Sequence, residues 1–273
     1  MNLTERLLAQ SRQCNSLLCV GLDPVKERLP QAMRQQADPI LAFNQHIVEA
    51  TATWACAFKP NIAFYEALGP AGLETLRRTI SFIHEQTNAL VIIDAKRGDI
   101  GNTSAAYAQA LFDVLQADAV TLNPYLGRDA LAPFLNRPDR GALILCRTSN
   151  PGAGEFQDLS VAGRPLYQIV AERVRTWNEL GNCGLVVGAT FPEELATVRD
   201  QCPEMPLLVP GVGAQQGDLA AAVRAGVDRQ GERILVNVAR SILYASEGPD
   251  FAAAAAQAAE HYCWAINDAR ATV

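Results

Sequence analysis

Short apolar segments alternate with amphipathic segments along this chain, and the alternation restricts the possible folds more than any other feature. The apolar segments are rich in Val, Ile and Leu, which is typical of strands buried on both faces. Such strands, when separated by helices, form a parallel sheet, and eight of them fit a closed (β/α)8 TIM barrel better than an open sheet. The predicted strands are residues 17–22, 55–59, 90–95, 119–123, 142–148, 184–189, 207–210 and 234–238.

The segments between the strands predict helices, so we expect one α/β barrel domain over residues 1–273. The predicted helices are residues 39–52, 72–86, 102–115, 166–180, 218–225 and 250–270. Residues 149–165 form the longest irregular stretch between them. A loop of this length in a compact barrel is usually a lid or a binding loop, and a decorative insertion is the alternative.

Charge and cysteine usage exclude several classes of protein. The net charge of −6 argues against a nucleic-acid partner, because phosphate backbones require a basic face. The apolar stretches are too short to span a bilayer, and charged residues interrupt the N-terminal pattern, so we expect neither a membrane segment nor a signal peptide. Seven scattered cysteines indicate reduced thiols in a cytoplasmic protein, and the lack of clustered ligands predicts no metal site.

Charged residues gather where the predicted strands end, which is where TIM barrels carry their chemistry. Asp94 and Lys96 are two positions apart, so their side chains point the same way on an extended strand, and they follow an apolar run at 91–93. Lys59 ends the preceding strand and could complete an alternating array. Structural ion pairs are the alternative, but buried ion pairs rarely stabilise a fold more than apolar packing does. The array therefore indicates a functional site.

A second group of residues predicts a phosphate site. The sequence PGVGAQQG at residues 210–217 follows the seventh strand, and Arg240 follows the eighth. Glycine N–H groups can approach an anion closely, while Gln215 adds an amide donor and Arg240 a charged one. A phosphate site after strands seven and eight recurs in barrels of this kind.

The sequence DAKRGDIGNT, residues 94–103, matches the DxKxxD pattern of the orotidine 5′-monophosphate decarboxylase family. The chain resembles this family over its whole length, because further motifs follow in the family's order. These are GLDP at 21–24, FKPN at 58–61, TSNPG at 148–152, PGVGAQ at 210–215 and ARS at 239–241. NPY at 123–125 and the long loop after strand five are similar to the longer bacterial branch.

The resemblance implies a decarboxylase of orotidine 5′-monophosphate that needs neither metal nor cofactor and forms homodimers with shared active sites. Lys96 would stabilise the carbanion at pyrimidine C6 and then protonate it, with Asp94 beside the substrate carboxylate. Asp99 would reach the partner subunit's site. The other implied roles are ribose binding by Asp23 and Lys59, a cross-subunit contact by Thr103, a pyrimidine contact by Ser149, phosphate binding by Gln215 and Arg240, and further substrate contacts by Asn123 and Pro210.

Three other functions remain open on sequence grounds. Related barrels with DxKxxD are magnesium-dependent sugar-phosphate lyases or synthases, but those tend to need a carboxylate where this chain has Lys59. An aldolase that forms a Schiff base through Lys96 is the second, and borohydride trapping would reveal it. A non-catalytic sensor of phosphorylated metabolites is the third, and a turnover assay would decide it. Residues 229–234 lengthen the link into strand eight, and we assign them no role.

Overall fold

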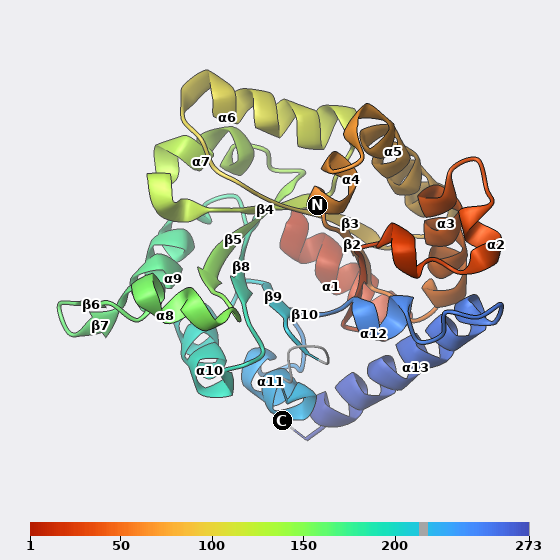
Figure 1. The fold of residues 1–273 in the computed structure, drawn as a ribbon. Helices are drawn as coiled ribbons and strands as arrows, with labels where there is room; N and C mark the ends of the chain where they lie inside the picture. Colours follow the sequence, from red (N-terminus) through yellow and green to blue (C-terminus); the bar gives the residue numbers. More distant parts are fainter. Residues whose placement is uncertain (213–217, 273) are drawn as a thin grey trace.

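Eight parallel strands close into a barrel in a computed structural model that describes residues 1–212 and 218–272. The strands pair in the order β1-β10-β9-β8-β5-β4-β3-β2, so the predicted (β/α)8 barrel is confirmed (Figure 1). All eight strands begin and end within two residues of the prediction, and β3 extends two residues further than expected. The strands are β1 (Leu18–Leu22), β2 (Ala57–Pro60), β3 (Leu90–Arg97), β4 (Ala119–Leu122), β5 (Gly141–Arg147), β8 (Cys183–Val187), β9 (Leu207–Pro210) and β10 (Ile234–Val238).

Side chains alternate between the barrel interior and the helical layer along each strand. Ala57 and Ile92 belong to the cluster inside the barrel, whereas Phe58 and Val91 pack in the cluster under the helices. This alternation follows from the period of two of an extended chain. Extended to the strand ends, this alternation directs Lys59 and Asp94 to the interior.

A ring of helices surrounds the barrel (Figure 1). Each predicted helix is present, with ends that differ from the prediction by no more than three residues, and the third ends in a π-helical segment, Gln109–Val114. The helices are α1 (Leu3–Cys14), α2 (Gln31–Arg34), α3 (Pro39–Thr51), α4 (Ala63–Glu66), α5 (Gly69–Gln86), α6 (Gly101–Ala108), α7 (Arg128–Leu135), α8 (Gly154–Gln157), α9 (Leu166–Trp177), α10 (Pro192–Gln201), α11 (Leu219–Gly226), α12 (Arg240–Leu243) and α13 (Phe251–Arg270).

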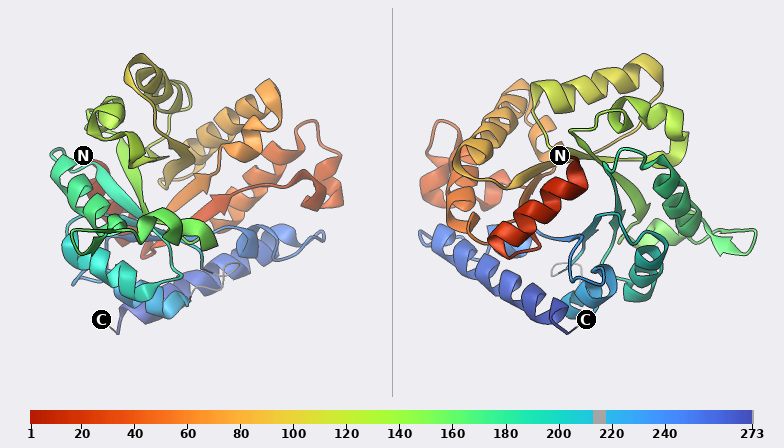
Figure 2. Two further views of the ribbon diagram at one scale, coloured as in Figure 1. Left: turned by 60° about the vertical axis from the view of Figure 1, so that its left-hand side comes forward. Right: turned by 180° about the vertical axis from the view of Figure 1, so that it is seen from behind.

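Helix α1 was not predicted, and it lies across the barrel at the end where the strands begin (Figure 2, right). Asn2 and Glu5 form a reciprocal capping box that starts the helix, with Glu5 N donating to Asn2 Oδ1 at 2.9 Å. Leu3 and Leu7 pack against the interior cluster and are almost fully buried. The helix therefore closes the barrel at this end and leaves the other end for a site.

Helix α13 completes the outer ring by packing against α3 and α11. Its alanines let these helices approach closely, and Ala255 and Ala259 are fully buried. Among the residues that the structure describes, no helix combines the length and the hydropathy needed to cross a membrane.

Residues 149–165 are more regular than we expected. They contain the one-turn helix α8 and the hairpin of β6 (Ser160–Val161) and β7 (Arg164–Pro165), which projects from the body of the molecule (Figure 1).

Residues 229–234, which had no role assigned from the sequence, contribute ion pairs to the fold. Arg233 pairs with Asp228 at 2.9 Å, and Glu232 pairs with Arg12 of α1 at 2.6 Å.

Candidate active site

A cavity of about 510 Å³ opens at the carboxyl ends of the strands. Its walls combine the charged residues of β1 to β3, apolar residues of β5, β8 and β9, and polar residues that follow β5 and β10. The lining includes Asp23, Lys59, Asp94, Lys96, Thr121, Leu145, Thr148, Ser149, Asn150, Gln157, Val186, Leu208, Pro210, Gly211, Val212, Asn237, Ala239, Arg240 and Ser241.

The charged array of Lys59, Asp94 and Lys96 forms one continuous set of ion pairs. Lys59 Nζ lies 3.0 Å from Asp94 Oδ2, and Lys96 Nζ lies 2.6 Å from Asp94 Oδ1. Lys59 is almost completely buried, whereas about half of the Lys96 side chain remains exposed. Asp94 therefore holds two ammonium groups, and the more accessible one, on Lys96, is among the groups that line the cavity.

The electrostatics keep the array ionised. Burial by itself would raise the pKa of Asp94, but the charges of Lys59 and Lys96 and the hydrogen bonds to Asp94 hold that pKa well below its ordinary value. Burial also opposes the charged form of Lys59, but the charges of Asp94 and Asp23 outweigh it and raise the pKa of Lys59. Both groups are therefore charged at neutral pH.

Two buried polar atoms in the cavity wall have no hydrogen-bond partner within the described part of the chain. They are Asp23 Oδ1 and Asn237 Oδ1. Burial raises the pKa of Asp23, and the charge of Lys59 partly opposes that shift. Buried polar atoms are normally paired, because leaving one unpaired costs about 1–3 kcal/mol. These two oxygens are therefore available to a polar ligand.

Apolar side chains form the wall opposite the charged array, and a cationic side chain lies at the rim of the cavity after β10. Leu145, Val186 and Leu208 point into the barrel from β5, β8 and β9, and Arg240 is exposed at the rim. Gly21 is required near this rim, because a Cβ placed there would lie 2.5 Å from Ala239 Cβ. Gln215 lies outside the described residues.

Arg147 attaches the segment after β5 to the barrel. Its guanidinium is nearly fully buried and pairs with Glu194 of α10 and with Asp158, the residue after α8. Gln157 of α8 accepts a hydrogen bond from Thr148 N at 2.8 Å and donates one to Thr148 Oγ1 at 2.8 Å. These bonds hold Gln157 in the cavity wall beside Ser149.

Three of the predicted site residues do not line this chain's cavity. Asp99 Oδ1 accepts a hydrogen bond from Ile100 N at 2.7 Å, and Thr103 is exposed on α6. Asn123 is also exposed, and its Oδ1 accepts a hydrogen bond from Tyr125 N at 3.1 Å. The structure of one chain therefore brings Lys59, Asp94 and Lys96 together with Asp23, Ser149, Pro210 and Arg240, and leaves Asp99, Thr103 and Asn123 outside.

Sequence reasoning did not single out several residues of the cavity wall, among them the polar residues Thr121 and Gln157. Thr121 donates a hydrogen bond to Asp94 Oδ1 at 2.8 Å. Its inward direction follows from the buried Ala119 two positions earlier, so the period of β4 was a usable signal. No pattern in the sequence indicates Gln157, because its position depends on the three-dimensional path of residues 149–165.

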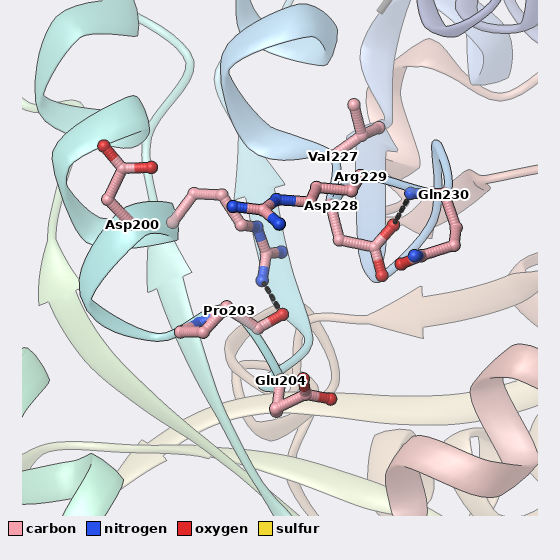
Figure 3. Close-up of a pocket in the computed structure, with 8 residues that line it drawn as sticks. Asp200, Pro203, Glu204, Val227, Asp228, Arg229 and Gln230 are labelled. Carbon is pink, nitrogen blue, oxygen red and sulfur yellow. Dashed lines mark hydrogen bonds between the residues drawn. The ribbon is translucent and has the colours of Figure 1, made fainter.

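A second cavity, of about 590 Å³, lies near the opposite ends of the strands (Figure 3). Asp228 there accepts a hydrogen bond from Gln230 N at 3.0 Å. Arg199 is buried in its wall and donates to the carbonyl oxygens of Gly226, Cys202 and Met205, which end α11 and precede β9. These contacts satisfy helix-end carbonyls and explain the buried cation structurally.

Within residues 1–212 and 218–272, no three His, Cys, Asp or Glu side chains are grouped to hold a metal ion.

Comparisons with known proteins agree with this arrangement. The sequence model of the orotidine 5′-phosphate decarboxylase / HUMPS family matches residues 16–256. The chain belongs to this family. It is 52% identical to an orotidine 5′-phosphate decarboxylase of Roseiflexus castenholzii over 271 residues, which cover 98% of each protein. The family expected from the sequence motifs is thus confirmed.

Solved structures of the family share the fold. A Toxoplasma gondii structure described as a putative orotidine-monophosphate decarboxylase superimposes with a TM-score of 0.91 at 38% identity, and the match covers 99% of this chain and 98% of that one. Leishmania donovani UMP synthase gives a TM-score of 0.89 at 40% identity. That match covers 99% of this chain but only 57% of the Leishmania protein.

Proposed function

We propose that this chain catalyses the decarboxylation of orotidine 5′-monophosphate to uridine 5′-monophosphate and carbon dioxide, the last step of de novo UMP synthesis. The observation that carries the proposal is the charged array of Lys59, Asp94 and Lys96 in the cavity of a decarboxylase-family barrel. The reaction needs neither metal nor cofactor, because the array itself supplies the stabilising charge and the proton.

Lys96 is the acid of the proposed mechanism. Loss of carbon dioxide leaves an electron pair on pyrimidine C6 that the ring cannot delocalise. A fixed ammonium near C6 stabilises this charge as it develops, which is the effective form of electrostatic catalysis. The same ammonium then gives its proton to C6, so that a C–H bond replaces the C–C bond and Lys96 regains its proton from solvent. Asp94 holds Lys96 in place through their ion pair, and Lys59 fixes the other oxygen of Asp94.

The remaining wall residues bind the nucleotide. The unpaired Asp23 Oδ1 is suited to accept a hydrogen bond from a ribose hydroxyl, and Lys59 adds a donor beside it. Arg240 at the rim, together with Gln215 and the backbone near Pro210, binds the phosphate. Ser149 contacts the pyrimidine. The segment 149–165 closes over the bound nucleotide and excludes water.

The protein acts as a cytoplasmic homodimer in this proposal, and Asp99 and Thr103 complete the partner's site. Asp99 lies two residues before α6 and does not line its own chain's cavity, and Ile100 next to it is 63% exposed. Tyr125, after β4, is 85% exposed. Apolar side chains at this edge support an interface, because leaving them in water is unfavourable and contact with a partner would bury them.

The ultraviolet absorbance of orotidine 5′-monophosphate incubated with the purified protein tests the proposed reaction. We expect full conversion to uridine 5′-monophosphate and no effect of EDTA. Orotidine without its phosphate should react far more slowly, because phosphate contacts contribute to transition-state binding. Unchanged substrate, or activity that depends on added magnesium, would refute the proposal.

A subunit-mixing experiment tests the shared site. Lys96→Ala and Asp99→Ala homodimers should each be nearly inactive. After exchange, half of the dimers are hybrids, and one of the two sites in each hybrid contains both residues, so roughly a quarter of wild-type activity should return. Mass spectrometry of tagged subunits verifies the exchange. If exchange occurs without recovery, Asp99 acts within its own chain.

A further inference from the structure

Thr121 occupies the point where the backbone of β3 leaves its regular pairing with β4. Ile93 pairs with Val120 and Arg97 pairs with Leu122, so three residues of β3 lie opposite the single residue Thr121. A bulge of this kind removes N–H groups from the hydrogen-bonded ladder. The N–H groups of Ala95 and Lys96 both donate to Thr121 Oγ1 instead, each at 3.0 Å.

The backbone of Lys96 is strained at this bulge. Its φ angle is +48°, in the left-handed region that residues with a side chain rarely occupy. Such a conformation costs a non-glycine residue on the order of 1 kcal/mol and persists only where the surroundings enforce it. The bond from Lys96 N to Thr121 Oγ1 is a direct restraint on this residue.

The same hydroxyl also holds the carboxylate of the charged array. Thr121 Oγ1 donates to Asp94 Oδ1 at 2.8 Å, and that oxygen also accepts the bond from Lys96 Nζ. A hydroxyl has one donor and two acceptor positions, and all three are used here. Thr121 is only 1% exposed, so no water molecule can readily replace these bonds. The hydroxyl has no hydrogen left to give to a substrate.

We propose that Thr121 is a positioning residue for the decarboxylation. Its hydroxyl holds both the backbone bulge at Lys96 and the carboxylate of Asp94, and it thereby orients the Lys96 ammonium group. This inference rests on the proposed function. Thr121 contributes no charge and no proton. It lowers the barrier by fixing the geometry of the groups that do, because electrostatic catalysis depends on groups that are oriented before the reaction.

The test compares Thr121→Val with Thr121→Ser. Valine keeps the shape of threonine but can neither accept from Ala95 N and Lys96 N nor donate to Asp94. Serine keeps the hydroxyl and loses only the methyl group. The control is Thr51→Val in α3, since Thr51 is also fully buried and its hydroxyl donates to Ile47 O at 2.7 Å, far from the charged array.

Thr121→Val should lower kcat about 100-fold, the size of effect seen when one preorganised donor is removed from a catalytic site. The Kd for the product uridine 5′-monophosphate should change less than about threefold, because binding uses other residues. Thr121→Ser should stay within about tenfold of the wild-type kcat, and Thr51→Val should equal the wild type in kcat.

Several results would overturn the inference. A kcat of Thr121→Val within about threefold of wild type would remove the positioning role. Equal losses in kcat and in product binding, without restoration by serine, would indicate a structural role only.

If Thr121→Val does not fold, Thr121→Cys replaces it, because a thiol fits the space but is a weak donor and acceptor. A kcat for Thr121→Cys equal to that of Thr121→Ser would then refute the inference. Absence of turnover by the wild type would instead refute the proposed function, and the role of Thr121 with it.

Discussion

Asp94 and Asp118 are buried carboxylates near opposite ends of the barrel, and the comparison shows how the two ends differ. Asp118, just before β4, accepts bonds from Arg6 of α1 at 2.6 Å and from Val91 N at 2.8 Å, and it pairs with His84 of α5 at 3.1 Å. All of these partners belong to the framework, so the carboxylate joins α1, α5 and β3. The Asp118 carboxylate therefore interacts with residues that hold the fold together.

Asp94 at the other end has partners of a different kind. Two of them are ammonium groups, and the one on Lys96 remains half exposed beside a cavity. The neighbouring Asp23 has an oxygen without a partner among the described residues. The amino end of the barrel therefore uses polar groups to join elements, whereas the carboxyl end keeps some of them available to a ligand. Substitutions at the two ends should accordingly affect different properties.

The largest expected effect is that of Lys96→Ala on turnover. The substitution removes both charge stabilisation and the proton donor, each worth at least about 100-fold, so kcat should fall by about 10⁴-fold or more. Circular dichroism should show a folded chain. The exposed Lys26→Ala is the matched control and should keep wild-type activity. If Lys96→Ala stays within tenfold of wild type, Lys96 is not the acid.

Arg240→Ala should have the next largest effect, on kcat/KM. The loss should correspond to about 2–5 kcal/mol if the guanidinium pairs with a phosphate in the closed site. Steady-state kinetics with orotidine 5′-monophosphate and with orotidine measure it. Orotidine lacks the phosphate, so its turnover should not change in this variant. An equal loss for both compounds would place Arg240 elsewhere in the mechanism.

Asp118→Asn should lower the free energy of unfolding by about 2–3 kcal/mol and leave kcat unchanged. Urea unfolding measures the loss, and the exposed Asp139→Asn is the control, with an expected change below about 0.5 kcal/mol. A fall in kcat without a fall in stability would contradict the division between the two ends.

The pH dependence of this stability difference follows from the direction of the pKa shift. Burial opposes ionisation of Asp118, but its hydrogen bonds and the charge of Arg6 lower its pKa in the folded chain. A lowered pKa means that the carboxylate contributes fully above the unfolded value of about 3.9. The contribution is lost as the pH falls through the folded pKa. The difference between wild type and Asp118→Asn should therefore be constant near neutral pH and shrink below about pH 4.

The smallest expected effect is that of Arg147→Met, which sharpens the comparison within the carboxyl end. Arg147 lies near the cavity, but its bonds to Glu194, Asp158 and Gln157 are internal, as those of Asp118 are. Its loss should loosen the segment that holds Gln157 and raise KM about tenfold, or about 1.4 kcal/mol, with little change in kcat. A drop in kcat as large as that of Lys96→Ala would show that Arg147 acts on the reacting atoms.

The amino-acid sequence determined the barrel and the charged array to a large extent. Eight buried apolar segments separated by helical patterns allow few folds other than a (β/α)8 barrel. The period of two of an extended strand predicted Asp94 and Lys96 on the same side, with Lys59 of the preceding strand beside them, and the three side chains do form one set of ion pairs. The motifs around these residues were sufficient to indicate the family. These conclusions depend on local periodicity, which a sequence displays directly.

Other features were decided only by the tertiary structure. Helix α1 closes the amino end of the barrel through Leu3 and Leu7, and its role depends on a barrel that the rest of the chain must first form. The left-handed backbone at Lys96 and its restraint by Thr121 arise from a mismatch in the pairing of β3 with β4. The difference between the two ends of the barrel likewise depends on contacts between distant residues. These contacts pair the charges at the amino end and leave some polar groups available at the carboxyl end. Sequence periodicity specifies which side of a strand a residue faces, but not which atoms it meets there.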